Sequence, residues 1–260
     1  MRERIMRRER MLGRVAFFFS KYRDSGALHW REMTSRSLRM FNAHQQARYD
    51  ITLQALGNIR GKTVVDLGCG DGALTSLLVR GGGGVTGVDN ETEGLELAKE
   101  NFLSDGLAAT FVQGSVEQCP LPDGMADAVV SCDVIEHLDH PDRHVAEISR
   151  VLKPGGVAVI TTPYRICETP APFHIHEFTP CELRSLAEPY FIDIRIRETH
   201  HMFWNAFFNY RPRLLRRIHL GRIFINMMTL WFRCNPFLED ATHRKKRDYF
   251  TQITLRGVKK

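Results

Sequence analysis

The decisive stretch of this chain of 260 residues reads VVDLGCGDG over residues 64–72. A β-branched run ends in Asp66, glycines then alternate at Gly68, Gly70 and Gly72, and an apolar helical pattern follows. Glycine lets the backbone turn sharply and approach a ligand closely, because it has no Cβ. A strand–turn–helix corner of this kind is where α/β sheets bind nucleotide-like ligands. The stretch therefore predicts an enzyme built around one nucleotide-like cofactor.

Strands and helices alternate on the carboxyl-terminal side of this corner. Such alternation predicts an α/β fold, with a doubly wound and mostly parallel sheet covered on both faces. A further helix is expected after Thr179, because Glu182 stands in the capping-box position. Residues 36–60 are expected to form one or two helices that lead into the first strand. The expected strands cover residues 63–67, 85–89, 108–112, 127–133, 157–162, 191–197 and 249–258, and the further helices before Thr179 cover 73–80, 92–104 and 141–152.

The formal charge of +6 is unevenly distributed. Residues 1–20 carry six Arg against two Glu, and residues 201–260 carry 13 basic against three acidic residues. The middle of the chain is acidic. Basic ends suit an anionic partner such as a membrane surface, although a solvated charged surface without a partner is the alternative. We expect a basic extension over residues 1–35 and one domain over 36–260.

A helical insert is predicted at about residues 198–248, between the last two expected strands. It is aromatic, apolar and basic, which favours a cap over the active site with peripheral membrane contact; a cap that only packs on the sheet is the alternative. The most apolar run, 223–232, is shorter than the roughly 18–20 residues of a membrane span. Six scattered cysteines without a CxxC pair, and no convincing signal peptide, predict a cytoplasmic location.

Asp89 ends the second expected strand, 21 residues after Gly68. A carboxylate at this position accepts hydrogen bonds from the ribose hydroxyls of an adenosine moiety. The loop that contains Ser115 and Val116 follows the next strand, where an adenine ring would lie if Asp89 held the ribose. A surface turn is the alternative for that loop.

Four segments in this order resemble the class I S-adenosylmethionine-dependent methyltransferases. They read VVDLGCGDG (64–72), VTGVD (85–89), QGSVEQCPLPDGMADAVVSCDVIEHL (113–138) and LKPGGVAVITTP (152–163). The resemblance implies a Rossmann-like sheet of seven strands in the order 3-2-1-4-5-7-6. It also implies S-adenosyl-L-methionine as the cofactor.

The same resemblance implies which residues line the cofactor site. It places Asp66 and its neighbouring glycines at the methionine end, and Ser131 to Asp133 toward the methyl group and the acceptor. A nearer resemblance is to the ubiquinone-biosynthesis O-methyltransferases, through CDVIEHL (132–138), and it implies that Arg48 pairs with the methionine carboxylate. The expected cofactor residues are Arg48, Asp66, Gly68, Cys69, Gly70, Asp89, Asn90, Ser115, Val116 and Cys132.

Acidic and imidazole side chains follow two neighbouring strands of the predicted sheet. Carboxylates and imidazoles suit a divalent ion such as Mg²⁺, Mn²⁺ or Zn²⁺, which would lower the pKa of an acceptor hydroxyl. His137 acting as a metal-free general base, or a purely structural role for the group, are the alternatives. The expected ligands are Asp133, Glu136, His137 and His176, with His174 and Glu177 close by.

The sequence thus predicts O-methylation of a hydroxyl on a small, lipid-like or sugar-type acceptor, with His137 as the catalytic residue. The basic ends and the metal-like group also suit an RNA 2′-O-methyltransferase, but the chain contains no recognisable RNA-binding module, so a nucleic acid partner is not expected. A non-catalytic cofactor-binding partner and a dehydrogenase are further alternatives, which cofactor binding would separate.

Overall fold

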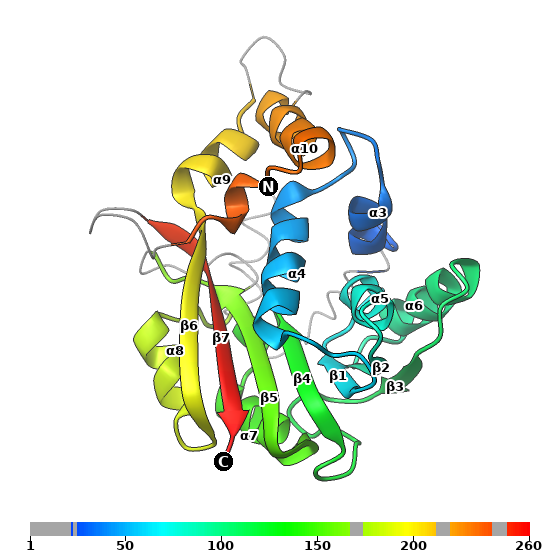
Figure 1. The fold of residues 1–260 in the computed structure, drawn as a ribbon, viewed down its shortest axis with the longest axis vertical. Coiled ribbons are helices and arrows are strands. Elements are labelled where there is room, and N and C mark those ends of the chain that lie inside the picture. The colour runs from blue at the N-terminus through cyan, green and yellow to red at the C-terminus, as the bar shows by residue number, and fades with distance from the viewer. Residues whose placement is uncertain (1–21, 23–24, 167–173, 212–218, 241–248) are drawn as a thin grey trace, which may run out of the picture.

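A computed structural model describes residues 22, 25–166, 174–211, 219–240 and 249–260. Within these residues, seven strands form one sheet in the order β3-β2-β1-β4-β5-β7-β6, which confirms the predicted order (Figure 1). Strands β1 to β5 are mutually parallel, and β7 is antiparallel to both of its neighbours. The strands are β1 (Thr63–Leu67), β2 (Gly84–Asp89), β3 (Thr110–Gln113), β4 (Ala126–Cys132), β5 (Leu152–Pro163), β6 (Phe191–His201) and β7 (Phe250–Lys259).

Helices cover both faces of the sheet, as expected for a doubly wound fold. Along β1, Val64 packs with helices α4 and α5 on one face, whereas Val65 and Leu67 pack with α7 and α8 on the other. This alternation follows from the two-residue repeat of a strand. The helices are α3 (Leu28–Thr34), α4 (Ala43–Leu56), α5 (Ala73–Arg80), α6 (Thr92–Ser104), α7 (Pro141–Val151), α8 (Pro180–Ala187), α9 (Met202–Phe208) and α10 (Leu220–Phe232), with 3₁₀ turns η1 (Ile135–His137) and η3 (Pro236–Leu238).

Most predicted elements agree with the structure to within two residues. The capping box of α8 is present, because Thr179 Oγ1 accepts from the Glu182 backbone and the Glu182 side chain accepts from the Thr179 backbone. Strands β5 and β6 are exceptions, since β5 begins at Leu152 rather than at residue 157 and β6 ends at His201 rather than at residue 197. Leu152 pairs with Ala126 across a register shift, so the turn-like LKPGG segment is drawn into the sheet.

Residues 25–35, predicted as part of an irregular extension, contain a packed helix. Trp30 of α3 is buried, its ring lies 5.9 Å from that of Phe102, and its backbone N–H donates to Asp71 Oδ2 at 3.0 Å. These contacts tie α3 to the glycine corner. Residues 1–21 of the predicted extension lie outside the described residues.

The predicted insert contains α9, α10 and η3, which lie beyond the carboxyl ends of the parallel strands (Figure 1). They pack on the start of α4, where Phe41, Phe208 and Phe237 share a buried cluster with Ile225. Strand β6 continues to His201, because it stays paired with β7 as far as Phe250. The helical part of the insert therefore starts four residues later than predicted.

Candidate functional site

The glycine corner joins β1 to α5 in a conformation that side chains disfavour. Gly68, Gly70 and Gly72 have φ angles of +80°, +53° and +80°. The backbone N–H of Gly68 donates to the Val88 carbonyl at 2.7 Å, which holds the corner against β2. A Cβ on Gly68 would collide with the side chain of Val134. Both the dihedral angles and the space therefore require glycine here.

Asp89 lies directly beside this corner, at the carboxyl end of β2. Its Oδ2 accepts a hydrogen bond from the Gly70 backbone at 2.8 Å, and its Oδ1 accepts from the Glu91 backbone at 2.9 Å. Its carbonyl accepts from the Gly114 backbone at 2.9 Å, which brings in the loop after β3. The structure thus brings together the three segments predicted to bind the sugar and base of the cofactor.

The other predicted residues of this region differ in exposure. Asn90 and Ser115 are exposed, whereas Val116 and Cys69 are buried. Ser115 Oγ accepts from the Glu117 backbone at 3.1 Å and so shapes its own loop. Asn90 and Ser115 thus lie at the surface, whereas the Cys69 backbone N–H donates to the Val88 carbonyl at 3.1 Å.

Asp66 is directed into the protein. Its Oδ2 accepts from Thr75 Oγ1 of α5 at 2.6 Å, and the carboxyl is fully buried. Burial raises the pKa of Asp66 to about 7, although the hydrogen bond from Thr75 opposes the change. The side chain thus joins β1 to α5. Thr75 was not predicted, because nothing local marks a helix threonine as a partner.

Arg48, predicted to pair with the methionine carboxylate, makes two side-chain contacts within the protein. Its guanidinium, on α4, forms an ion pair with Asp133 and a hydrogen bond with Gln45. Its Nε is buried and finds no hydrogen-bond partner among the described residues. The Arg48 guanidinium therefore lies near the end of β4, where its ion pair holds the Asp133 carboxylate in place.

Asp133 was predicted to be a metal ligand, but its carboxylate is bonded to other protein side chains, and it does not belong to the group of possible ligands that the described residues form. It has a φ of +54°, and its Oδ1 accepts from Gln252 Nε2 at 2.6 Å and from Thr161 Oγ1 at 3.2 Å. Sequence reasoning missed Gln252, which is 119 residues away on β7. The register of β5 with β7, which no local motif specifies, brings the amide to this point.

The residues just before Asp133 are also enclosed. Ser131 is buried and its Oγ lies 2.9 Å from His144 Nε2, so it does not face the acceptor side as predicted. Cys132 Sγ lies 3.1 Å from Thr161 Oγ1, and burial raises the pKa of the Cys132 thiol. The end of β4 is therefore held by side chains from α7 and β5.

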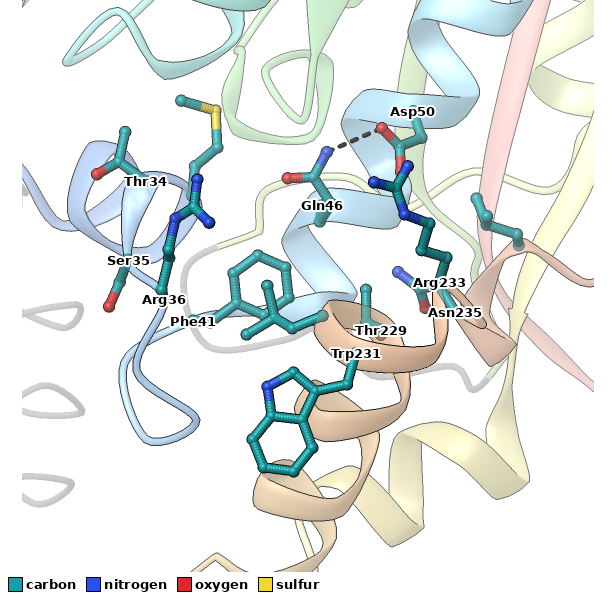
Figure 2. A pocket seen from close by; sticks show the side chains of 13 residues that line it. Thr34, Ser35, Arg36, Phe41, Gln46, Asp50, Thr229, Trp231, Arg233 and Asn235 are labelled. Carbon is teal, nitrogen blue, oxygen red and sulfur yellow. Dashed lines mark hydrogen bonds between the residues drawn. The ribbon is translucent and has the colours of Figure 1, made fainter.

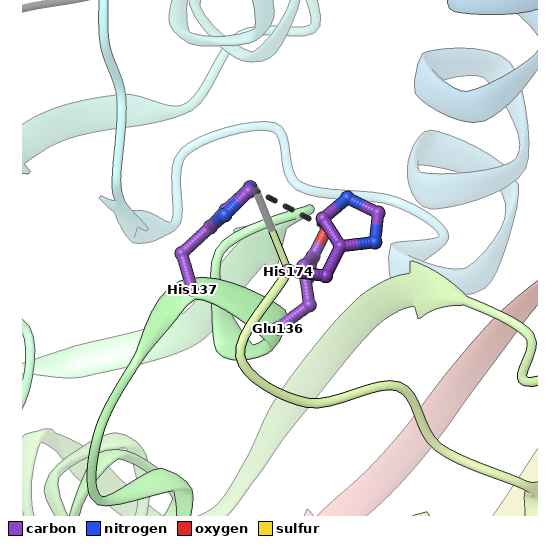
Figure 3. A group of neighbouring side chains, drawn as sticks. All are labelled: Glu136, His137 and His174. Carbon is purple, nitrogen blue, oxygen red and sulfur yellow. Dashed lines mark ion pairs between the residues drawn. The ribbon is translucent and has the colours of Figure 1, made fainter. Parts of the chain in front are cut away.

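A compact group of possible ligands is formed by Glu136, His137 and His174 (Figure 3). One ligand atom from each lies within 4.8 Å of the others. Glu136 is buried and accepts from Thr162 Oγ1 at 3.0 Å, and His174 Nδ1 lies 2.8 Å from Glu177 Oε1. Such outer hydrogen bonds orient the ligands of metal sites. The donor set fits a divalent ion.

His176 does not join this group, contrary to the prediction. Its backbone N–H donates to the Glu136 carbonyl at 3.1 Å, and its ring lies 6.1 Å from that of Phe178. His174 takes the predicted place, with its ring 5.1 Å from that of His137. The loop thus contributes one imidazole to the group of possible ligands, as predicted, but from His174 and not from His176.

Tyr22 is a further residue of the corner that sequence reasoning missed. Its hydroxyl occupies the space where a Cβ on Gly70 would lie, and its ring packs against Gly94. Its backbone N–H donates to Glu91 Oε1 at 3.3 Å. Burial raises the pKa of the Tyr22 phenol. A residue upstream of all the motifs therefore covers the glycine corner.

Comparisons with known proteins agree with this architecture. Residues 65–160 match the family model described as a methyltransferase domain. The chain is 37% identical over 116 residues to a ubiquinone biosynthesis O-methyltransferase of Photorhabdus laumondii, which covers 44% of this chain and 48% of that protein. It is 32% identical over 148 residues to a probable S-adenosylmethionine-dependent methyltransferase of Mycolicibacterium smegmatis, covering 54% and 56%. The chain thus spans about half the length of these curated relatives.

The fold is similar to that of a phosphoethanolamine N-methyltransferase 2 of Haemonchus contortus, solved in complex with S-adenosyl-L-methionine. The match has a TM-score of 0.66 at 19% identity and covers 93% of this chain and 58% of that one. At this identity the likeness concerns the fold alone.

Proposed function

Because the chain carries a class I S-adenosylmethionine-dependent methyltransferase domain, we propose that the protein methylates a hydroxyl on a small, lipid-like or sugar-type acceptor. The observation that carries this proposal is the contact between Asp89 and Gly70, which sets a carboxylate beside a glycine corner at the carboxyl edge of the sheet. The names of the matched O-methyltransferases support a hydroxyl as the acceptor.

The residues at the corner fit the cofactor. Asp89 would accept hydrogen bonds from the ribose hydroxyls, and the left-handed backbone of Gly68 and Gly70 would shape the turn along which the methionine part lies. Asn90, Ser115 and Val116 would border the adenosine. When bound, S-adenosylmethionine supplies a methyl group on a positively charged sulfur. The protein has mainly to align the acceptor oxygen with that methyl carbon.

His137 is the proposed general base. Its side chain is 45% exposed on η1, so an acceptor can reach it, and its Nε2 lies 4.0 Å from Glu136 Oε1. Nε2 would accept the hydroxyl proton as the bond from the acceptor oxygen to the methyl carbon forms. The buried Glu136 carboxylate would then stabilise the protonated imidazole.

A divalent ion bound by Glu136, His137 and His174 is the second proposed use of the same group. A bound ion would hold the acceptor oxygen and lower the pKa of its hydroxyl. The hydrogen bond between His174 and Glu177 supports this use, since it leaves the other ring nitrogen of His174 for a ligand role. The two uses exclude each other at His137, and metal removal separates them.

The insert supports peripheral membrane contact as part of the proposal. Phe203, Trp231 and Phe232 are 60–70% exposed on α9 and α10, and Arg233 follows directly. Aromatic and basic side chains together suit a membrane surface. No helix within the described ranges combines the length and apolarity that crossing a bilayer requires. A cytoplasmic location stays a prediction.

Calorimetric titration with S-adenosylhomocysteine, with and without EDTA, tests the proposal. We expect one site of micromolar affinity that EDTA leaves unchanged, because the cofactor residues do not include the metal group. Titration with NAD serves as the control for nucleotide binding in general. Binding of NAD without binding of S-adenosylhomocysteine would overturn the proposal in favour of a dehydrogenase.

A further inference from the structure

A pocket of about 590 Å³ lies between α4 and the end of α10 (Figure 2). Gln46 and Asp50 of α4 line it, whereas Arg48 forms its ion pair with Asp133. Residues two apart on a helix point about 200° apart, so these side chains stand on opposite faces of α4. The pocket is therefore separate from the glycine corner and from the group at Glu136.

One wall of the pocket is apolar and comes from three different segments. Phe41 precedes α4, Leu230 and Trp231 lie in the last turn of α10, and Leu238 belongs to η3. The Trp231 side chain is 65% exposed, so its indole stands at the rim rather than in the core. The hydrophobic effect favours the binding of a hydrocarbon group to this wall, because binding removes apolar surface from water.

The charged side chains of the pocket are two arginines and one aspartate. Arg36 follows α3 and Arg233 follows α10, and the two lie on opposite sides of the pocket (Figure 2). Asp50 Oδ1 accepts from Gln46 Nε2 at 2.8 Å, and burial raises the pKa of Asp50. The positive charges outnumber the negative one, which favours an anion between the guanidinium groups.

The backbone at Arg233 is unusual in the same place. Arg233 has a φ of +52°, in the left-handed region that glycine or asparagine usually occupies at the end of a helix. This conformation stops α10 and turns the chain so that Arg233 and Asn235 both line the pocket. The strained residue is thus one of the two cations, and strain of this kind concentrates at functional sites.

We propose that this pocket binds an anionic amphiphile, with its phosphate or carboxylate between Arg36 and Arg233. Its hydrocarbon part lies on Phe41, Leu230 and Trp231. A lipid of a membrane surface and a free amphiphile share this chemistry. The site goes beyond the proposed methyl transfer and does not depend on it, because none of its residues belongs to the candidate active site.

Calorimetry with octyl phosphate below its micelle concentration tests the charges. We expect saturable binding to the wild type and a loss of about tenfold or more in Arg36→Gln/Arg233→Gln, since two charge-assisted contacts are removed. The matched control is Arg60→Gln/Arg143→Gln, which removes two exposed arginines elsewhere and stays within about twofold of wild type. Equal affinity in the two double variants overturns the proposal.

The apolar wall is tested with the same protein and inorganic phosphate. We expect phosphate to bind much more weakly than octyl phosphate, and Trp231→Ala to weaken octyl phosphate only. Trp231 is exposed, so this variant folds even where the arginine variant does not. Phosphate binding as tightly as octyl phosphate contradicts the proposed amphiphile.

Sedimentation with phosphatidylglycerol vesicles identifies the source of the ligand. A loss in Arg36→Gln/Arg233→Gln relative to its control supports a membrane lipid, and equal sedimentation beside a loss of octyl phosphate binding supports a free amphiphile. S-adenosylhomocysteine is titrated into every variant. Its binding to all of them shows a folded cofactor site, and its failure to bind the wild type counts against the proposed function without affecting the pocket.

Discussion

Arg48 on α4 pairs with Asp133 at the end of β4, and both side chains are more than four-fifths buried. The pair joins a helix that precedes the sheet to the strand that carries the proposed catalytic segment. Gln252 of β7 and Thr161 of β5 hold the same carboxylate. Three elements far apart in the sequence thus fix one residue whose backbone has a positive φ.

Removing the arginine of this pair is expected to destabilise the protein strongly. Arg48→Gln leaves the Asp133 carboxylate buried without its cation, and we expect the free energy of unfolding to fall by about 3 kcal/mol. Urea denaturation followed by circular dichroism measures the change. Arg80→Gln, which breaks the exposed pair between Arg80 and Asp105, is the control and loses less than about 1 kcal/mol. Similar losses in both variants contradict a buried structural role for Arg48.

Asp89 is expected to govern cofactor affinity. Asp89→Asn keeps the shape but removes the charged acceptor, and we expect S-adenosylhomocysteine to bind about 10- to 100-fold more weakly. Calorimetry gives the dissociation constants. Asp105→Asn, at the end of α6, is the control with unchanged affinity. If Asp89→Asn bound S-adenosylhomocysteine with wild-type affinity, the Asp89 carboxylate would not be the group that binds the ribose.

Metal binding is expected to depend on Glu136 and not on His176. Titration of the protein with Zn²⁺ or Mn²⁺ should show one site, and Glu136→Gln should weaken it by about tenfold or more, because the only anionic ligand of the group is lost. His176→Gln is the matched control, since it removes an imidazole from the same loop. If the metal affinity of Glu136→Gln is unchanged, the group is not the metal site, and the proposal that His137 acts as a metal-free base is favoured.

Buried histidines are expected to make stability depend on pH. Burial lowers the pKa of His144 from its ordinary value of 6.5 to about 4, although its hydrogen bond to the Val116 carbonyl opposes the change. Below pH 6.5 the unfolded chain takes up a proton that the folded protein cannot accept until about pH 4. The folded protein therefore loses stability as the pH falls through this window, by about 2 kcal/mol at pH 5.

The variant His144→Gln isolates this contribution. Denaturation at pH 7.5 and at pH 5 should show a smaller loss in His144→Gln than in the wild type, whereas the exposed His140→Gln should behave as the wild type does. The comparison is made between variants because Asp66 titrates in the opposite direction. Its pKa is raised to about 7, so it favours the folded state at low pH and disfavours it as the pH rises. A parallel pH response of His144→Gln and wild type would contradict the role of His144.

The sequence predicted the parts of the site that depend on strand order. Gly70 and Asp89 follow adjacent parallel strands, so their meeting at one edge of the sheet was foreseeable from two local patterns. The contact between Asp133 and Gln252 was not, because it depends on the register of two antiparallel strands. Tyr22 was missed for a similar reason, since no periodicity marks a tyrosine that covers a turn from a distance.

The choice between His174 and His176 was also beyond the sequence. Both lie in a segment without helical or strand periodicity in its sequence. Hydrogen bonds of the backbone determine which of the two imidazoles lies beside His137. The N–H groups of Ile175 and His176 both donate to the Glu136 carbonyl, which sets His174 beside His137. A spacing of two residues allowed either imidazole to be the ligand.

The position of β7 in the sheet has a consequence for how the protein is made. Strand β7 lies between β5 and β6, yet the ribosome delivers it after both. Until it arrives, β5 presents an open row of backbone donors and acceptors, and such edges recruit other strands. Gln252 belongs to β7, so the hydrogen bond from its amide to Asp133 also cannot form before β7 is synthesised. The nascent chain therefore passes through a stage in which β5 has an unpaired edge and the candidate site is incomplete, and chaperones that shield exposed strands would act at that stage.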